Sequence, residues 1–407
     1  MKKLNCQLVV SGIVAMSLPV LTGCSSDEPN QPTKAPLIGI ELEAEQLPYI
    51  ESTNQFAVNL WNEINAEADR NNFIMSPLSL QMGLSLLANG ASGETYQELS
   101  SVLLPEFDGT ASLDRLNQVN STLLEKLPKT DSKAKIKLAN SIWMAHTLTP
   151  VKSFEDRVNR YYGASIFNFI PGSESDRKAI NDWCSNATSG MIDELFKSAP
   201  EEDIILINAL SFKHDWARQF DKSKTKKEYF YSQSGTSEKV EMMKDAYKGE
   251  VYVTDEAWMV RRPYGNGAFV MELYKPLDGY TVAEAVSAGV GVSYDRNINL
   301  GLPKVNLESE IDFKKVLKSM GLSHALDEMA DYSGMSDTKL MIEKIFQKSK
   351  IEIDENGTKV VSVTTISGAT STAPPKDVDF TLNHPFGFVI RETSTNVIVA
   401  MGKISEL

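Results

Sequence analysis

Few residues in this chain have the types and the spacing that acid–base, nucleophilic or metal chemistry needs. The 407 residues contain no HExxH, CxxC, GxSxG or phosphate-loop motif. The four histidines are His146, His214, His324 and His384. His214 precedes Asp215, but neighbouring residues on a strand point to opposite faces, so this pair is a poor catalytic dyad. We interpret the histidines as structural and expect no catalytic residue, no metal site and no cofactor.

The segment "DENGT", residues 354–358, has the acidic and turn-forming residues of a calcium loop. It lacks the alternating ligands and the final glutamate of such a loop, so it predicts a tight turn. Residues 356–375, "NGTKVVSVTTISGATSTAPP", carry no charge between Lys359 and Lys376 and are rich in β-branched side chains. This composition is typical of a buried strand, whereas the turn before it and the proline pair at its end are typical of a loop.

The two faces of this segment would differ if it formed a strand, because alternate residues point to opposite sides. One face has no charge and no bulky polar group; it comprises Thr358, Val360, Ser362, Thr364, Ile366 and Gly368. The other face carries a single charge, Lys359, at its beginning. The segment could therefore enter a sheet as a central strand. The alternative is a permanent strand of a sheet.

The rest of the chain supplies the elements that would hold this segment. Residues 51–68 have apolar side chains at helical spacing. Strands are predicted at 135–145, at the continuous apolar run 203–213 and at the alternating segment 348–354. Helical patterns come mostly first and strands mostly later, with no internal repeat or linker, so residues 48–407 predict one α+β domain.

The N-terminus has the features of an export signal. Two lysines precede an apolar stretch, residues 8–20, which is too short for a membrane-spanning helix. The stretch leads into "LTGC", which resembles a bacterial lipobox. That resemblance implies removal of residues 1–23 and acylation of Cys24. Residues 24–47 begin with a polar, proline-rich run and predict a flexible tether.

These features predict an exported protein, lipid-anchored to the bacterial outer membrane at its periplasmic or cell-surface face. The acidic pair Asp27 and Glu28 resembles signals for the outer face. The alternative is an ordinary signal peptide with an incidental cysteine. Once Cys6 leaves with the leader and Cys24 is acylated, Cys184 has no cysteine left to pair with and is expected to pack in the core.

The net charge of −13 makes the surface acidic as a whole. Removing residues 1–23 removes two lysines, and −13 minus 2 gives −15 for the mature chain. Nucleic acid is therefore not expected as a partner, because phosphate binding needs clustered Lys and Arg. We interpret the short basic run 222–227 as a solvated loop.

Seven stretches together resemble the serpin family, in family order and at family-like spacing, across residues 50–407. They are "NFIMSPLSLQMGLSLLANGASGET", "INDWCSNATSGMIDELF", "LINALSFKHDWARQF", "LGLPKVNLESE", "MGLSHALDEMADYSGMS", "KIEIDENGT" and "FTLNHPFGFVIRETSTNVIVAMGKI". The resemblance implies an α+β fold of three β-sheets and about nine helices. It also implies an exposed reactive-centre loop between "DENGT" and "NHPFGF".

Inhibitory serpins act as suicide substrates. A protease cleaves the loop, becomes ester-linked to it, and is trapped when the loop inserts into the central sheet. The resemblance therefore implies insertion of loop 357–371, a monomeric inhibitor, and a covalent complex with the target protease. The implied hinge comprises Glu355, Gly357, Thr358, Lys359 and Val360.

The family's usual count from the hinge glutamate places the cleaved bond between Ser371 and Thr372. A count back from Phe386 gives Pro374 instead, and Thr370 and Ala369 are the next candidates. The side chains around these positions are small and neutral. They suit elastase-like or subtilisin-like proteases and some cysteine proteases, rather than trypsin-like enzymes.

The chain also departs from the family pattern. Lys359 replaces a glutamate, and Val360 is larger than the usual alanine, which would slow insertion. Shutter residues under the sheet match at Ser76, Ser79 and Asn208, but Gln347 stands where a histidine is usual. These departures keep open a non-inhibitory serpin that acts as a cell-surface binding or scaffold protein. A surface hydrolase or glycan-binding lipoprotein is disfavoured by the lack of a catalytic constellation.

Overall fold

The computed structural model describes residues 36–67, 71–104, 109–188, 190, 192, 194–357 and 373–407, without the side chains of 109–111 and 209–211. The expected signal peptide (1–23), Cys24 and most of the tether lie outside these ranges. So do the expected hinge residues Thr358, Lys359 and Val360, and the expected cleavage site at Ser371 and Thr372.

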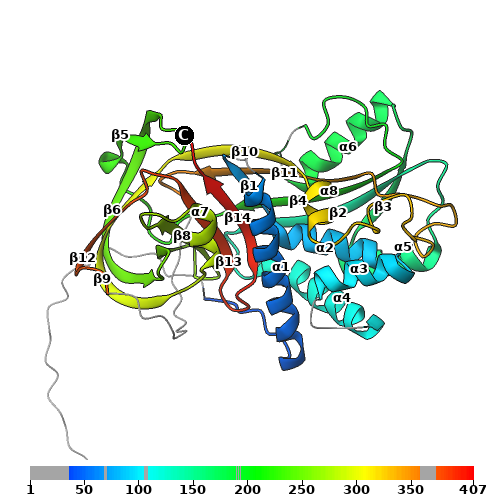
Figure 1. Ribbon diagram of the computed structural model, residues 1–407, viewed down its shortest axis with the longest axis horizontal. Helices are drawn as coiled ribbons and strands as arrows, with labels where there is room; N and C mark the ends of the chain where they lie inside the picture. The colour runs from blue at the N-terminus through cyan, green and yellow to red at the C-terminus, as the bar shows by residue number, and fades with distance from the viewer. Residues whose placement is uncertain are drawn as a thin grey trace, which may run out of the picture. The chain divides into compact units, whose positions relative to one another are not determined.

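A five-stranded sheet forms one half of the domain (Figure 1). Its order is β10 (Val305–Asp312), β11 (Lys344–Ile353), β4 (Ile204–Lys213), β2 (Lys135–Ala145) and β3 (Ser165–Phe169). β4 pairs antiparallel with β2 on one side and parallel with β11 on the other. The predictions of strands at 135–145 and 203–213 are confirmed. The strand predicted at 348–354 begins four residues earlier, at Lys344.

A larger, nine-stranded sheet forms the other half. Its order is β1 (Phe73–Met75), β14 (Ile398–Ile404), β13 (Phe386–Glu392), β8 (Phe269–Pro276), β7 (Ala257–Pro263), β6 (Ser237–Val253), β9 (Val292–Pro303) and β12 (Asp377–Thr381), with β5 (Lys226–Tyr231) beside β6. The expected second and third sheets share β6: its residues 242–253 pair with β9, and its last three also pair with β7. The two therefore form one continuous hydrogen-bonded sheet.

Eight α-helices surround the sheets within the described ranges. They are α1 (Leu47–Ala66), α2 (Pro77–Ala88), α3 (Gly93–Leu103), α4 (Gly109–Lys126), α5 (Lys152–Tyr162), α6 (Glu174–Ala187), α7 (Val282–Ser287) and α8 (Lys314–Ser319). Three short 3-10 turns accompany them at Ala44–Gln46, Leu127–Lys129 and Lys222–Lys224. Across these ranges, no helix has the length and the apolar composition that crossing a membrane requires.

The two faces of the five-stranded sheet are covered by different helices (Figure 1). On one face α6 packs Ile180 and Cys184 against Ile205 and Ile207 of β4. On the other face α2, in which every residue is buried, packs with the cluster that contains alternate residues of β4. β4 is thus buried on both faces, as its unbroken apolar sequence predicts. Burial raises the pKa of the Cys184 thiol to about 11, so this cysteine is a core residue without nucleophilic character.

A buried charge network ties three strands of the larger sheet together. Glu272 of β8 is fully buried and accepts hydrogen bonds from Arg261 of β7 at 2.8 Å and from Arg391 of β13 at 2.8 Å. Tyr274 donates a further bond at 3.0 Å. Burial works to raise the pKa of the Glu272 carboxyl, but the guanidinium groups of Arg391 and Arg261 outweigh it and hold that pKa below its usual value.

We expect Glu272→Gln to lower the free energy of unfolding by about 3–5 kcal/mol, because it leaves two largely buried guanidinium groups without a counter-charge. Urea denaturation at pH 7 measures this effect. The matched control is Glu308→Gln, which removes an ion pair to Lys348 in which the glutamate is 52% exposed. The control should cost at most about 1 kcal/mol. Equal losses in the two variants would contradict the account.

Candidate functional site

The pairing between β4 and β11 is incomplete. These two parallel strands pair over four positions, from Ile205 with Lys344 to Asn208 with Gln347. Beyond that point the facing edges of 209–213 and 348–353 pair with no strand that the structure describes. A chain that followed Ile353, turned and came back between the two strands would run antiparallel to both. It could complete the ladder on both of its sides.

A pocket of about 270 Å³ opens where the two strands have parted. Its walls come from the ends of β4 and β11, the turn after β11, and the larger sheet behind them. They include Phe212, His214, Tyr264, Ile353, Asn356 and Gly357. The pocket therefore lies directly beside the last described residues of the expected hinge.

The turn after β11 is fixed by its own side chain and by the segment after β4. The Asp354 carboxylate accepts hydrogen bonds from the backbone N–H groups of Asn356 (2.8 Å) and Gly357 (3.1 Å). This is the tight turn that "DENGT" predicts. The backbone N–H of Trp216 donates to the Asn356 carbonyl at 2.9 Å, and that of Phe220 donates to the Glu355 carbonyl at 3.0 Å. The hinge thus shares backbone hydrogen bonds with the chain that leaves β4.

Glu355 holds the hinge to two neighbouring segments. Its carboxylate lies 3.0 Å from the Lys304 ammonium and accepts a hydrogen bond from the Thr225 hydroxyl at 2.8 Å. Burial works to raise the pKa of Glu355, but the contacts with Lys304 and Thr225 outweigh it and leave that pKa below its usual value. The other described hinge residue, Gly357, is in close contact with the backbone. A Cβ there would lie 2.6 Å from the His214 carbonyl oxygen, so a larger residue would push the hinge away from β4.

The four expected shutter residues lie at or near the point where β4 and β11 part. Gln347 accepts a hydrogen bond from the Ser76 backbone N–H at 2.7 Å and donates one to the Ser76 carbonyl at 3.1 Å. Ser76 caps α2 by accepting from the Ser79 N–H at 3.2 Å, and its hydroxyl donates to the Val399 carbonyl at 2.7 Å. Gln347 therefore provides both the donor and the acceptor that the position needs.

Asn208 has a different partner from the other three. Its amide donates to Asn140 of β2 at 2.7 Å, and its side-chain oxygen has no partner among the described residues. The Ser79 hydroxyl is likewise buried and unpartnered in the described part of the chain. The Asn208 amide oxygen, an acceptor, and the Ser79 hydroxyl, a donor and an acceptor, therefore leave hydrogen-bonding capacity near the place where a new strand would arrive.

Sequence reasoning missed several partners of these residues. Asn140, Thr225 and Lys304 are far from them in the chain, and nothing in their local pattern marks them as contacts. Trp216, in the stretch "FKHDWARQF", was visible as a motif, but its hydrogen bonds to the hinge were not. Asp131, which pairs with the His214 ring at 3.1 Å, was missed for the same reason.

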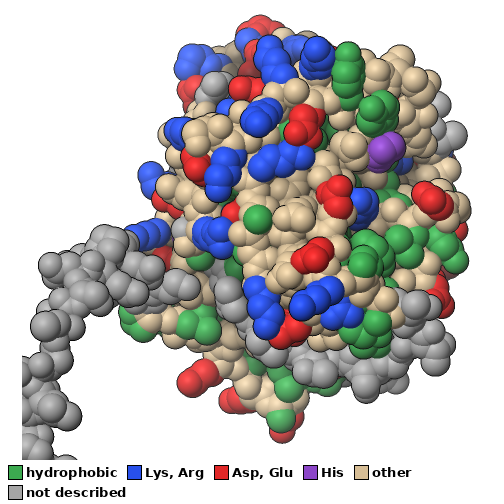
Figure 2. All heavy atoms as spheres, turned by 90° about the vertical axis from the view of Figure 1, so that its left-hand side faces the viewer, with side chains coloured by type: hydrophobic (Ala, Val, Ile, Leu, Met, Phe, Trp, Pro, Cys, Tyr) green, Lys and Arg blue, Asp and Glu red, His purple; other side chains and the backbone are tan. Residues whose placement is uncertain are grey.

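The distal end of the expected loop is also fixed. The Pro374 carbonyl accepts from Arg296 at 2.9 Å, and the Lys376 carbonyl accepts from the backbone of Asn297 at 3.0 Å. From Asp377 the chain continues as β12, parallel to β9. This end of the domain, with β5, β6, β9 and β12, faces the viewer in Figure 2, where Lys and Arg side chains gather in the upper half. Residues of the basic run 222–227 are mostly exposed, as expected, but they form a 3-10 turn and the start of β5 rather than a loop.

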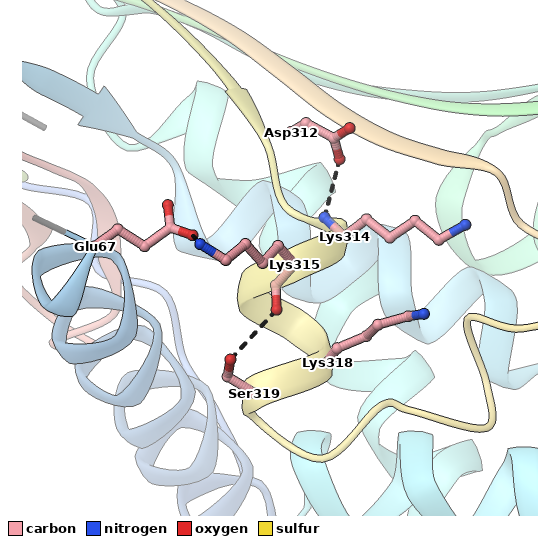
Figure 3. A pocket seen from close by; sticks show the side chains of 6 residues that line it. All are labelled: Glu67, Asp312, Lys314, Lys315, Lys318 and Ser319. Carbon is pink, nitrogen blue, oxygen red and sulfur yellow. Dashed lines mark hydrogen bonds and ion pairs between the residues drawn. The ribbon is translucent and has the colours of Figure 1, made fainter. Parts of the chain in front are cut away.

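Another surface pocket, of about 770 Å³, lies beside α8 (Figure 3). Lys315 points across it to Glu67 and forms an ion pair at 3.0 Å, while Lys314 and Lys318 extend away from this pair. Among the residues that the structure describes, no histidine or cysteine lines it. The described residues also contain no cluster of three or more His, Cys, Asp or Glu placed to hold a metal ion.

Comparison with known proteins assigns the family. The family model "Serpin (serine protease inhibitor)" matches residues 51–407. Serpin B6 of Pongo abelii is 29% identical over 379 residues, covering 87% of this chain and 98% of the relative. An uncharacterized serpin-like protein of Methanosarcina mazei is 24% identical over 371 residues, covering 87% of this chain and 86% of the relative.

The solved structures agree. The thermophilic serpin tengpin in its native state matches with a TM-score of 0.78 and 28% identity, over 92% of this chain and 97% of tengpin. A thyroxine-binding globulin in complex with thyroxine matches in fold with a TM-score of 0.75 at 23% identity, over 88% of this chain and 98% of that one. The chain belongs to the serpin family, whose members are mostly protease inhibitors.

Replacing Gln347 tests the contact under the sheet. We expect Gln347→Ala to lower the free energy of unfolding by about 1–3 kcal/mol, because the buried Ser76 N–H loses its acceptor. Gln347→His, which can again accept that bond, should recover part of the loss. Chemical denaturation of both variants measures this. A Gln347→Ala variant as stable as the wild type would contradict the role of the contact.

Replacing Glu355 tests the hinge anchor. Glu355→Lys places an ammonium beside Lys304, whereas Glu355→Gln keeps an acceptor for Thr225. A hydrogen bond to a charged group contributes about 1.5–3 kcal/mol. We therefore expect the Trp216 and Phe220 amides, which bond to the hinge, to exchange about 10- to 100-fold faster in Glu355→Lys, and less so in Glu355→Gln. Unchanged exchange in Glu355→Lys would show that the anchor does not hold the hinge.

Proposed function

We propose that this serpin is a suicide-substrate inhibitor of serine proteases that traps the acyl-enzyme by inserting loop 357–371 between β4 and β11. The single observation that carries the proposal is the short pairing of these two strands, with the hinge directly beside their unpaired edges. Family membership supports protease inhibition in general. The mechanism and the target are the parts that we propose.

The length of the loop supports insertion. Positions 358–372, fifteen residues, separate the described residues Gly357 and Ala373, and β11 is ten residues long. Six residues of β11, 348–353, have no described partner on the side that faces β4, so the loop is long enough to pair with all of them. Each ladder hydrogen bond contributes about 1 kcal/mol net, so a dozen ordered residues supply a driving force on the order of 10 kcal/mol. The apolar and β-branched face of residues 358–368 adds to it when buried.

The outcome for a protease depends on rates. Insertion must be faster than hydrolysis of the acyl-enzyme, so the hinge must be held firmly before cleavage and released readily afterwards. The contacts of Glu355 and the backbone bonds of Trp216 and Phe220 supply the first condition. The size of Val360 acts against a ready release after cleavage. Lys359 would point to the solvent side of the inserted strand and should be tolerated.

We place the cleaved bond between Ser371 and Thr372 and the preferred targets among elastase-like or subtilisin-like proteases, with some cysteine proteases as further targets. The support is the small, neutral sequence "GATST", which fits shallow specificity pockets. We also propose that residues 1–23 are removed and that lipid on Cys24 anchors the inhibitor, as a monomer, to the bacterial outer membrane. It would there protect the cell envelope from proteases.

A second candidate function is a non-inhibitory serpin that binds another molecule at the cell surface. Lys359 and Val360 favour it, because both depart from the small and acidic residues that inhibitory members carry at these hinge positions. Under this alternative the loop would be cut without trapping the protease.

The alternation of the loop gives the sharpest test. We expect the wild type to form a complex with an elastase-like or subtilisin-like protease that survives denaturing electrophoresis. Thr364→Arg, which puts a charge on the face to be buried, should convert the inhibitor into a substrate that is cleaved at the same bond. Thr365→Arg puts the same charge on the opposite face and should still form the complex.

Two results would contradict the proposal. Cleavage of the wild type by every protease of these classes without a stable complex would favour the second candidate function. Equal behaviour of the two arginine variants would show that the loop does not insert as a strand with these faces. Mass spectrometry of the released peptide locates the cleaved bond in either case.

A further inference from the structure

His214 occupies a fully enclosed position at the open end of the five-stranded sheet. It follows directly after β4, and its side chain is 0% exposed. The ring stacks on Tyr264, with ring centroids 5.7 Å apart, and the residue lines the pocket between the parted strands. Its backbone carbonyl lies against the hinge residue Gly357. A change in the position of His214 would therefore alter the contact between its carbonyl and the hinge.

The hydrogen bonds of the ring fit only its neutral form. Nδ1 accepts a hydrogen bond from the Asp215 backbone N–H at 2.9 Å. Since Nδ1 is an acceptor, the proton of the neutral ring is on Nε2, which donates to Asp131 at 3.1 Å. A second proton would have to sit on Nδ1, where it would face the Asp215 N–H, so that two donors would meet. Protonation therefore breaks the bond between the ring and the backbone of Asp215.

The surroundings of Asp131 are already complete. Its carboxylate accepts from the backbone N–H groups of Lys133 (2.8 Å) and Asn266 (2.7 Å), in addition to His214. The anchor of the His214 ring is thus held by its own turn and by Asn266 of a distant segment, and it cannot easily follow a shifted ring. The remaining charged groups near His214 are Lys133 and Asp215, and, along the pocket, Lys213, Glu352 and Asp354.

Backbone contacts connect this ring to the hinge in two steps. The Asp215 carbonyl accepts from Gly265 at 3.0 Å, and the next residue, Trp216, donates its backbone N–H to Asn356 of the hinge at 2.9 Å. The Trp216 indole N–H also donates to the Asp354 carbonyl at 2.8 Å. Loss of the bond between His214 and Asp215 frees the peptide unit that precedes these contacts.

We propose that His214, anchored by Asp131, is a positioning residue for loop insertion: its neutral ring holds the segment that follows β4 in contact with the hinge turn at residues 354–357, and uptake of a proton releases these contacts. This inference deepens the proposed function and depends on it for its biological meaning. We call the release of these contacts opening. Opening is a property of the uncleaved protein and can be measured without a protease.

The sign of the effect follows from linkage. Burial lowers the pKa of His214 below its ordinary value, and the attraction of Asp131 offsets this only in part. When the contacts between this segment and the hinge are released, water reaches the ring and its pKa returns to about 6.5. Between these two values the open form binds more protons than the closed form, so the closed form loses stability as the pH falls below about 6.5. Acid therefore favours opening.

The experiment is amide hydrogen exchange of the intact, uncleaved protein between pH 5 and 7.5, followed in peptides that cover 209–217 and 348–357 and corrected for the intrinsic pH dependence of exchange. In the wild type, opening should increase below pH 6.5 by up to tenfold for each pH unit. His214→Asn keeps an acceptor for the Asp215 N–H but cannot titrate, so its opening should not depend on pH. His384→Gln removes an exposed histidine elsewhere and should behave as the wild type.

A wild type whose exchange in these peptides has no more pH dependence than that of His214→Asn would overturn the proposal. If His214→Asn does not fold, wild-type opening that is flat with pH would overturn it equally well. A second readout is the rate of insertion after cleavage, which should rise between pH 7.5 and 5.5 in the wild type and in His384→Gln. Exchange that responds to pH without any protease complex would leave this proposal standing and remove the proposed function. A stable protease complex together with exchange that does not depend on pH would support the proposed function and overturn this proposal.

Discussion

The structure depends on a pair of parallel strands that separate before they end. β4 and β11 exchange hydrogen bonds from Ile205 with Lys344 to Asn208 with Gln347 and then part, although both continue for five or six residues. Two facing edges of the described strands are left without a ladder in the centre of a sheet. Because each missing bond is worth about 1 kcal/mol, this arrangement stores free energy that a suitable strand can release. The turn at residues 354–357 lies at the mouth of that gap.

The contacts around the gap show how such a state can persist. At the closed end, Gln347 fixes the start of α2 through Ser76, and β11 is held against the helix. At the open end, Glu355 contacts Lys304 and Thr225, and the segment after β4 donates backbone bonds to the hinge. These contacts are few and local, so their loss costs little compared with the bonds that an inserted strand would make. A barrier of this kind delays the transition without abolishing its driving force.

The sequence was most informative where a local pattern decides the structure. The unbroken apolar run 203–213 predicts a strand buried on both faces, and β4 is sandwiched between α2 and α6. The residues of "DENGT" predict a turn, and Asp354 caps it. The sequence could not predict where the pairing of β4 and β11 stops, because that depends on the register of strands more than a hundred residues apart. For the same reason Asn140, Lys304 and Asp131 were missed. Each acts through a partner at least 50 residues away. The joining of two expected sheets through β6 could not be predicted either, because it depends on which strands pair with this long strand.

The central claim is that the gap between β4 and β11 is completed by the chain's own loop. The most direct measurement is the melting temperature of the purified protein before and after a single cleavage within residues 369–374. If the loop inserts, the gain on the order of 10 kcal/mol should raise the melting temperature by roughly 10–20 °C or more. A cleaved protein that melts at the same temperature as the intact one, or below it, would contradict the account.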